Sequence, residues 1–271
     1  MSTTPPLLVA PRELAPRLGD SAIRIVDLSR PDIYVQAHVP GALHLDYARI
    51  VAARPPIMGL LPDEHQLGAA MAEIGLEPDT HVVAYDEEGG GKAARLLWTL
   101  DAIGHRRYSL LDGGIHAWIA DLEPVSQELS AHRTGTQPIV YTGEGIADLA
   151  YVRTHLADPD TVLLDCRTPG EFSGEVKRAE RTGHIAGAVN YDWVNAMDRD
   201  RQLRLRPPEV LLRDLLTLGV TPEKEVIVYC QTHHRSAHTY FVLKHLGFPR
   251  VRGYPGSWSE WGNRKDTPIE P

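Results

Sequence analysis

Short apolar runs recur along the chain and alternate with longer segments of mixed polarity. Four such runs are residues 23–28 (IRIVDL), 81–85 (HVVAY), 161–165 (TVLLD) and 225–229 (EVIVY). Uninterrupted apolar runs of this length are typical of strands that are buried on both faces. Residues 92–103 and 209–218 instead have helical patterns. The alternation of strands and helices predicts an α/β fold in which parallel sheets are flanked by helices.

The pattern occurs twice, at a spacing of about 144 residues. The segment HVVAYDEEGGGKAARLLWTL at 81–100 aligns with EVIVYCQTHHRSAHTYFVLK at 225–244, and HVPGA at 38–42 aligns with HIAGA at 184–188. Residues 121–145 contain several Pro, Gly, Ser and Thr residues with little periodicity, which is typical of a linker. We therefore expect two homologous domains, 1–124 and 146–271, joined by a linker at 125–145.

Composition excludes several classes of protein. The net charge of -8 argues against a general nucleic-acid binder, and the chain has no apolar run of the length that a membrane span needs. Two cysteines in 271 residues argue against a disulfide framework and favour a reducing compartment. The N-terminal residues lack the features of a signal peptide, so we expect a cytoplasmic protein.

Cys230 directly follows the strand predicted at 225–229, and ligands of parallel sheets bind at the carboxyl ends of the strands. Residues 226–259 contain no Asp or Glu but hold Arg235, Lys244 and four histidines. We expect a loop at 231–236 and a helix from about 237. The backbone N–H groups of this loop, the N-terminus of the helix and Arg235 would all stabilise a thiolate. The sequence thus predicts a nucleophilic cysteine that acts on an anionic substrate.

The candidate contacts of that anion are the residues of the expected loop, namely Gln231, Thr232, His233, His234, Arg235 and Ser236. In the first half, Asp86 aligns with Cys230 and the acidic segment 87–91 (EEGGG) aligns with the basic loop. A carboxylate cannot replace a sulfur nucleophile, and an acidic loop repels anions. We therefore expect an inactive N-terminal domain and one active site per chain.

The segment around Cys230 has three other interpretations. Cysteine-dependent phosphatases use Cys-x5-Arg, whereas Cys230 and Arg235 form Cys-x4-Arg, whose smaller loop suits a single sulfur atom. A zinc site of Cys230, His233, His234 and His238 would need adjacent histidines to converge on one ion. A non-catalytic binding module would not require the cysteine loop.

Several other residues have structural interpretations. We expect Cys166 to pack in the hydrophobic core. We expect the same of Trp118 and Trp261, which occupy equivalent places in the two halves. His38 and His184 recur in both halves and read as residues that hold turns. Trp193 and Trp258 have no symmetric aromatic counterpart, and we expect them to line an interdomain cleft near Cys230.

Several segments of the chain resemble a known family. The segments Tyr34-x3-HVPGA-x2-Leu45 and 251–261 (VRGYPGSWSEW), together with the duplication and the cysteine loop, resemble the signatures of tandem-domain bacterial rhodaneses. The resemblance covers about 23–270 and implies a thiosulfate sulfurtransferase with a persulfide on Cys230. It implies an inactive first domain, a catalytic second domain, and neither cofactor nor metal. We expect a monomer whose acceptor is cyanide, a small thiol or a sulfur-acceptor protein.

The sequence departs from that family at two places. Many relatives carry a substrate-binding arginine where this chain has Glu171, so Arg167 is a further candidate for the anion site. The loop QTHHR matches neither the usual thiosulfate pattern nor the neutral loop of 3-mercaptopyruvate sulfurtransferases. Its basic character favours thiosulfate or a similar anionic donor, and 3-mercaptopyruvate stays as the alternative.

Overall fold

The apolar runs of the sequence form the central strands of two parallel sheets. The structure is a computed structural model that describes residues 5–131 and 135–271. Two units can be distinguished: unit 1 comprises Met1–Ile50, Pro62–Thr142 and Met197–Leu205, and unit 2 comprises Val51–Leu61, Gly143–Ala196 and Arg206–Pro271. The predicted fold class, two α/β units with parallel sheets flanked by helices, is confirmed.

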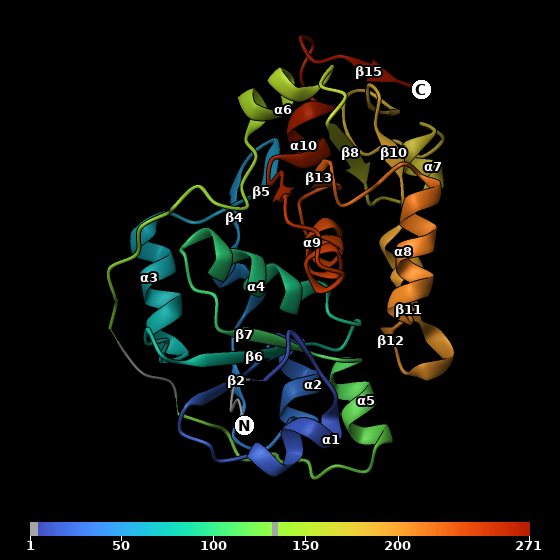
Figure 1. Ribbon diagram of the computed structural model, residues 1–271. Coiled ribbons are helices and arrows are strands. Elements are labelled where there is room, and N and C mark those ends of the chain that lie inside the picture. Colours follow the sequence, from blue (N-terminus) through green and yellow to red (C-terminus); the bar gives the residue numbers. More distant parts are fainter. Residues whose placement is uncertain (1–4, 132–134) are drawn as a thin grey trace. The chain divides into compact units, whose positions relative to one another are not determined.

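Unit 1 contains a five-stranded parallel sheet in the order β1-β7-β6-β2-β3. Its strands are β1 (Leu8–Val9), β2 (Ile23–Asp27), β3 (Leu43–His44), β6 (His81–Tyr85) and β7 (Tyr108–Leu111). Its helices are α1 (Pro11–Leu14), α2 (Pro31–Gln36), α3 (Glu64–Glu73), α4 (Gly91–Ala102) and α5 (Gly114–Ala120), with 3-10 turns η1 (Ala15–Arg17), η2 (Tyr47–Ile50) and η4 (Arg199–Arg201). Figure 1 shows α4 on one face of the sheet and α1 and α5 on the other.

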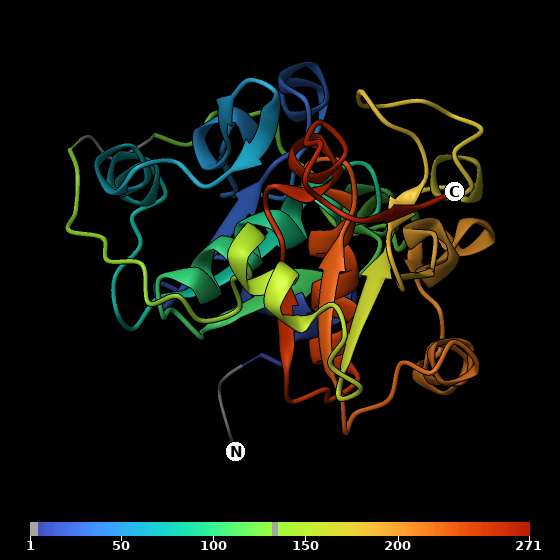
Figure 2. The same cartoon turned by 90° about the horizontal axis from the view of Figure 1, so that it is seen from above.

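Unit 2 repeats this arrangement with a four-stranded sheet in the order β10-β8-β13-β14. Its strands are β8 (Thr161–Asp165), β10 (Val189–Asn190), β13 (Glu225–Tyr229) and β14 (Val251–Gly253), with β9 (His184–Ile185) and β15 (Ile269–Glu270) in a separate antiparallel pair. Its helices are α6 (Leu149–His155), α7 (Pro169–Phe172), α8 (Pro208–Thr217), α9 (Arg235–His245) and α10 (Ser257–Trp261), with the 3-10 turn η3 (Trp193–Ala196). Figure 2 shows β8 and β13 side by side and pointing the same way.

Each half of the sequence supplies one short hairpin to the unit built by the other half. β4 (Ala52–Arg54) and β5 (Ile57–Leu60) belong to unit 2, whereas β11 (Met197–Asp198) and β12 (Arg204–Leu205) belong to unit 1. The domains expected from the sequence are contiguous, so they differ from the two units by this exchange. Most of the expected linker also lies with unit 1, which extends to Thr142, although residues 132–134 are outside the described part.

The two cores contain matching aromatic residues. Trp118 and Trp261 are fully buried, and each donates its indole N–H to a proline carbonyl, of Pro124 and Pro268 respectively. The matching histidines hold turns, as expected: His38 Nδ1 lies 2.7 Å from the Tyr34 carbonyl, and His184 Nδ1 lies 2.9 Å from that of Phe172. Duplicated packing therefore accounts for these repeated motifs, and catalysis is not needed to explain them.

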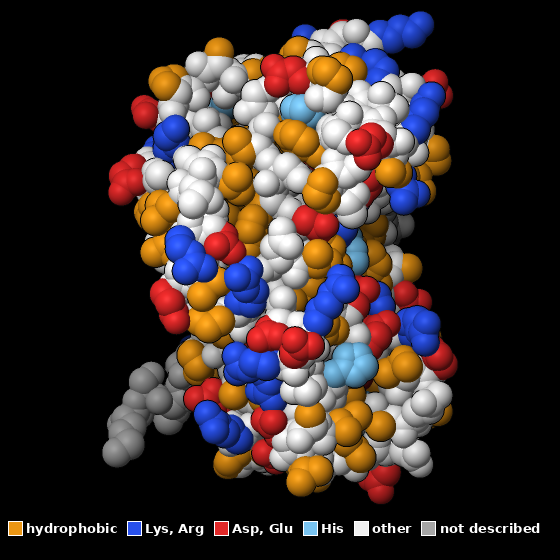
Figure 3. Space-filling view, turned by 90° about the vertical axis from the view of Figure 1, so that its right-hand side faces the viewer, with side chains coloured by type: hydrophobic (Ala, Val, Ile, Leu, Met, Phe, Trp, Pro, Cys, Tyr) orange, Lys and Arg blue, Asp and Glu red, His pale blue; other side chains and the backbone are white. Residues whose placement is uncertain are grey.

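The surface carries charges of both signs. On the face drawn in Figure 3, basic and acidic side chains are interspersed and neither sign forms a continuous field. In the part of the chain that the structure describes, no helix has both the length and the apolar character of a membrane span.

Candidate active site

Cys230 lies at the carboxyl end of β13, directly before a tight loop. β13 ends at Tyr229 and α9 begins at Arg235, so four residues, 231–234, connect Cys230 to the helix. The helix begins two residues before the position expected from the sequence. Arg235 and Ser236 therefore belong to the first turn of α9, where the backbone N–H groups have no partner within the helix. In this geometry the N-terminus of α9 points toward the thiol of Cys230.

The loop curls because one residue takes up a left-handed conformation. His233 has φ of 54° and is buried, and its Nδ1 lies 2.7 Å from the hydroxyl of Ser236. The equivalent residue of the first half is Gly89, with φ of 90°. A histidine costs more than a glycine in this region, and the contact with Ser236 helps to hold it there. The two loops thus share a left-handed residue at this position, but they differ at the next one, where Gly90 has φ of 102° and His234 has φ of -90°.

The base of the loop is fixed by α10. The N–H of Cys230 donates to Ser257 Oγ at 3.3 Å, and the carbonyl of Cys230 accepts the N–H of Trp258 at 2.9 Å. The carbonyl of Gln231 accepts the N–H of Ser259 at 3.0 Å. These bonds come from Ser257, Trp258 and Ser259, which lie within the signature at 251–261. Its role here is to anchor the backbone on either side of the reactive thiol.

The surroundings of Cys230 favour the thiolate. The side chain is fully buried, and burial by itself raises the pKa of a thiol. The charge of Arg235 and hydrogen bonds from Ser236 and from the backbone N–H of Thr232 outweigh that effect, so the pKa of Cys230 is lowered from its ordinary value. A thiolate held by converging donors is the species that attacks electrophiles.

Arg235 does not stand alone above the thiol. Its Nη1 donates to Glu171 Oε2 at 2.6 Å and its Nη2 donates to Glu171 Oε1 at 3.0 Å. Burial raises the pKa of Glu171, but the hydrogen bonds and charge of Arg235 hold it at about 2. Glu171, at the position where the resemblance implies an arginine, is therefore the partner of the loop arginine, which the sequence did not indicate.

The other loop side chains point in different directions. Gln231 Nε2 donates to the carbonyl of Arg178 at 3.1 Å, and the imidazole of His234 lies against the ring of Trp193 with the centroids 5.7 Å apart. Trp193 is thus close to the loop, as expected. Trp258 is instead buried in unit 2, where it contacts the guanidinium of Arg167. The expectation that Trp258 lines a cleft is therefore wrong, because its ring is part of the core.

Arg167 also has a structural role that the sequence did not reveal. Its side chain is fully buried, its Nε donates to Asp165 Oδ1 at 2.9 Å, and its Nη2 donates to the carbonyl of Gly183 at 2.8 Å. The guanidinium lies over the ring of Trp258 at 4.5 Å. Because Asp165 already neutralises this charge inside the core, we assign Arg167 to the fold and leave it out of the anion site.

Asp86 occupies in unit 1 the position that Cys230 has in unit 2. Its carboxylate accepts the N–H groups of the loop that follows it. Its Oδ1 accepts the N–H groups of Glu88 and Gly90, and its Oδ2 accepts that of Ala93, at 2.8 to 2.9 Å. Burial and the charge of Glu88 raise the pKa of Asp86 to about 6 although these bonds oppose the shift. The loop of unit 1 therefore encloses its own acid, and this acid fills the place where unit 2 presents a thiol.

The hairpin β4–β5 packs directly against the cysteine loop. A Cβ added to Gly59 would lie 2.2 Å from the carbonyl oxygen of Thr232 and 2.7 Å from that of Pro255. The N–H of Met58 also donates to Ser259 Oγ at 3.2 Å. Nothing in the local pattern of residues 51–61 indicates this contact, since the segment lies about 170 residues before Cys230 in the chain.

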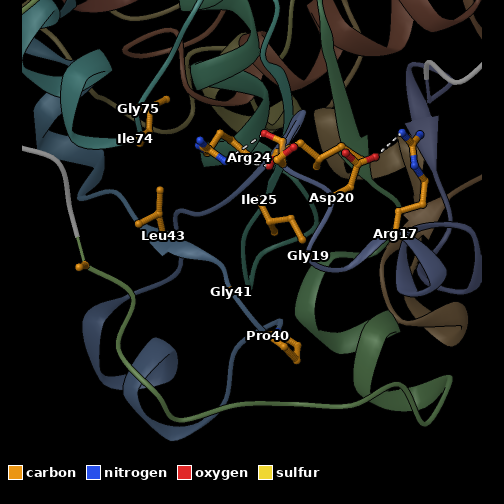
Figure 4. A pocket seen from close by; sticks show the side chains of 13 residues that line it. Arg17, Gly19, Asp20, Arg24, Ile25, Pro40, Gly41, Leu43, Ile74 and Gly75 are labelled. Atoms are coloured by element: carbon orange, nitrogen blue, oxygen red, sulfur yellow. Dashed lines mark hydrogen bonds and ion pairs between the residues drawn. The ribbon is translucent and has the colours of Figure 1, made fainter.

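A cavity in unit 1 was considered as an alternative site. It has a volume of about 330 Å³, and Arg17, Asp20 and Arg24 lie among its lining residues (Figure 4). An ion pair joins Arg17 to Asp20 across 3.1 Å. The lining includes the amino ends of β2 and β3, whereas ligands of parallel sheets bind at the carboxyl ends. Within 5–131 and 135–271, no cluster of three or more His, Cys, Asp or Glu side chains could hold a metal ion.

Comparisons with known proteins agree with this geometry. A family model described as the rhodanese-like domain matches the chain twice, at residues 10–121 and 148–264. A thiosulfate sulfurtransferase of Pseudomonas aeruginosa is 45% identical over 265 residues, which cover 98% of this chain and 97% of that protein. A 3-mercaptopyruvate sulfurtransferase of Escherichia coli is 30% identical over 287 residues, covering 100% of this chain and 99% of that protein.

The fold also has a close counterpart among solved structures. A variant of EanB in complex with ergothioneine superposes with a TM-score of 0.86 at 22% identity, covering 97% of this chain and 70% of that chain. At this identity the likeness shows the fold alone. The two matches of the family model and the relatives of nearly equal length carry the assignment: this chain belongs to the rhodanese family, with two rhodanese-like domains in tandem.

Proposed function

We propose that the chain is a sulfurtransferase that moves sulfane sulfur from thiosulfate to a thiophilic acceptor through a persulfide on Cys230. The observation that carries this proposal is the four-residue loop between Cys230 and α9, whose donors stabilise a buried thiolate. The identity of 45% to a thiosulfate sulfurtransferase supports thiosulfate as the donor. The identity to a 3-mercaptopyruvate sulfurtransferase is lower, at 30%, so 3-mercaptopyruvate has less support as the donor.

In the first step, the thiolate of Cys230 attacks the outer sulfur of thiosulfate. A new S–S bond forms to Cys230, the S–S bond of thiosulfate breaks, and sulfite leaves with the bonding electron pair. The negative charge then rests on the outer sulfur of the persulfide. The N–H groups of the loop and of the first turn of α9 face that sulfur, and the charge of Arg235 adds to their effect.

In the second step, an acceptor attacks the outer persulfide sulfur and the Cys230 thiolate leaves. With cyanide the product is thiocyanate, the Cys230 thiolate is regenerated, and the cycle needs no external oxidant or reductant. A small thiol or a sulfur-acceptor protein would accept the sulfur in the same way. Thr232, His233, His234, Arg235 and Ser236 form the anion site in this proposal, and Gln231 contributes through its backbone because its side chain is held by Arg178.

Intact-mass measurements test the proposal. Thiosulfate is expected to add one sulfur atom to the protein, and cyanide is expected to remove it. Cys230→Ala should gain nothing, whereas Cys166→Ala should be loaded like the wild type, because Cys166 does not share the donors that stabilise Cys230. The same experiment with 3-mercaptopyruvate ranks the two donors.

A wild-type mass that neither donor changes would overturn the proposal. Phosphatase substrates would then be tested, since the Cys-x4-Arg loop belongs to the same chemical class as the longer phosphatase loop. Sulfur gained equally by Cys230→Ala and by the wild type would exclude Cys230 as the carrier.

A further inference from the structure

Glu171 is held rigidly at the start of a short helix. It is the third residue of α7, and its Oε2 accepts the N–H of Thr168 at 3.2 Å and the hydroxyl of Thr168 at 3.0 Å. In return, the N–H of Glu171 donates to Thr168 Oγ1 at 3.3 Å. This reciprocal capping fixes the rotamer of Glu171. The residue is only 3% exposed, so the carboxylate has a single defined position.

The fixed carboxylate binds both terminal nitrogens of Arg235. The two parallel bonds, 2.6 and 3.0 Å long, form the bidentate arrangement that suits a guanidinium and a carboxylate best. The side chain of Arg235 is 18% exposed and that of Glu171 is 4% exposed, so the pair is largely shielded from water. A second cation, Arg178, has its Nε 3.7 Å from Glu171 Oε1 and is well exposed.

A buried carboxylate is an unexpected component of a site that binds anions. Taken by charge alone, Glu171 weakens the attraction between Arg235 and a donor such as thiosulfate. Arginine, however, is a long and flexible side chain whose charge is better hydrated in bulk water. Without a fixed partner, Arg235 would gain freedom and hydration by turning outward, and its charge would move away from Cys230.

We propose that Glu171 is a positioning residue for sulfur transfer, which holds the guanidinium of Arg235 beside the sulfur of Cys230. The inference rests on the proposed function and deepens it. It explains why a buried carboxylate is compatible with an anion site. In this chain Arg235 provides the charge, and Glu171 determines where that charge lies.

The proposal and the simple charge argument predict opposite signs. If Glu171 positions Arg235, Glu171→Ala lowers kcat/KM for thiosulfate by about tenfold or more, because a displaced charge no longer meets the reacting sulfur. Glu171→Gln should lose less, since its amide oxygen retains one acceptor for Arg235 and for the cap of α7. If Glu171 only weakens the anion site, both variants gain activity. Glu175→Gln, which removes an exposed carboxylate four residues away, is the matched control and should match the wild type.

A double-mutant cycle separates positioning from folding. Because Glu171 acts through Arg235, Glu171→Ala should cause no further loss in an Arg235→Ala background. An equal loss in both backgrounds would assign Glu171 to the stability of α7 and overturn the proposal. Thermal unfolding of each variant identifies any that does not fold, and Glu171→Gln, which preserves the cap, then carries the comparison.

A second measurement does not depend on the sulfur donor. The pH dependence of the reaction between iodoacetamide and Cys230 reports the thiolate directly. The charged and titratable groups near it are Arg235 with its partner Glu171, and Cys166 with Asp165 at the end of β8. His233 and His234 are titratable residues of the same loop, and their rings contact Ser236 and Trp193 respectively. Glu171→Ala should shift the midpoint to higher pH, and Glu175→Gln should not.

These outcomes distinguish the two proposals. A protein that takes no sulfur but still shows the shift would refute the proposed function and leave the role of Glu171 in place. A protein that is loaded normally and shows no shift would retain the function and refute the positioning role.

Discussion

Two cysteines follow neighbouring strands of unit 2 and have opposite properties. Cys166 comes after β8 and Cys230 after β13, and the N–H of Cys166 donates to the carbonyl of Tyr229 at 2.8 Å. Both are fully buried and free. Burial, together with the charge of Cys230, raises the pKa of Cys166 well above its usual value, whereas Arg235 and the donors of α9 lower that of Cys230. The reactivity of each thiol is therefore set by its donors and not by its exposure.

At the residue scale, this difference predicts selective alkylation. The reaction of Cys230 with iodoacetamide should persist as the pH falls below the ordinary thiol pKa of 9.0 and should decline only as the lowered pKa is reached. Arg235→Gln removes the positive charge that most lowers the pKa of Cys230. The midpoint of alkylation should therefore move to higher pH in this variant. Peptide mass analysis at each pH locates the label, and Cys166 should stay unlabelled. Labelling of Cys166 at the same rate would contradict this account of the two environments.

At the element scale, the cysteine loop is shaped by segments from distant parts of the chain. α10 binds the backbone around Cys230 through Ser257 and Trp258. The hairpin β4–β5 also packs against the loop, and its Gly59 leaves no room for a side chain beside Thr232. Two elements from distant parts of the chain thus restrict the position of the loop beside Cys230.

Gly59→Ala is the corresponding test. The added methyl group would meet the carbonyl of Thr232 at 2.2 Å, so the loop must shift. We expect the rate of sulfur loading from thiosulfate to fall by about tenfold or more, because small displacements of reacting groups are costly. Ala53→Val adds bulk at an exposed position of β4 and is the control. Equal rates in Gly59→Ala and Ala53→Val would show that the hairpin does not constrain the loop.

At the scale of the whole molecule, duplication has produced two loops at equivalent strand ends that contain different groups. The loop of unit 1 encloses Asp86, and the loop of unit 2 presents Cys230. Each unit is also completed by a hairpin from the other half of the sequence. The candidate site at Cys230 therefore depends on both halves of the sequence, because the hairpin β4–β5 of the first half packs against its loop.

The pH dependence of the unfolding free energy should show the contribution of the ion pair between Glu171 and Arg235. The folded pKa of Glu171, about 2, lies below its usual value of 4.5. The unfolded state therefore binds more protons in this interval, and the contribution of Glu171 is complete above pH 4.5 and is lost as the pH falls toward 2. The difference in unfolding free energy between the wild type and Glu171→Gln, measured with urea at pH 6 and about pH 3.5, should shrink at the lower pH. A difference that grows on acidification would refute the lowered pKa.

The sequence by itself determined the strands and the duplication, and it indicated Cys230 as the candidate nucleophile. The strands could be read because residues such as Val226 and Ile227 are buried on both faces of a parallel sheet, which leaves a continuous apolar run. The cysteine could be read because a strand end, a basic loop and a helix start are all local features. The contrast with Asp86 needed only an alignment of the two halves.

The tertiary structure alone decided the partners of the charged groups. Arg167 and Arg235 are both arginines near the predicted site, yet Asp165 holds the first in the core and Glu171 holds the second beside Cys230. Gly59 and Thr232 meet although about 170 residues separate them. Ion pairs and close packing depend on side-chain positions that come together only after folding. Local pattern therefore indicated the candidate nucleophile, and long-range contacts determine which partner holds each charge around it.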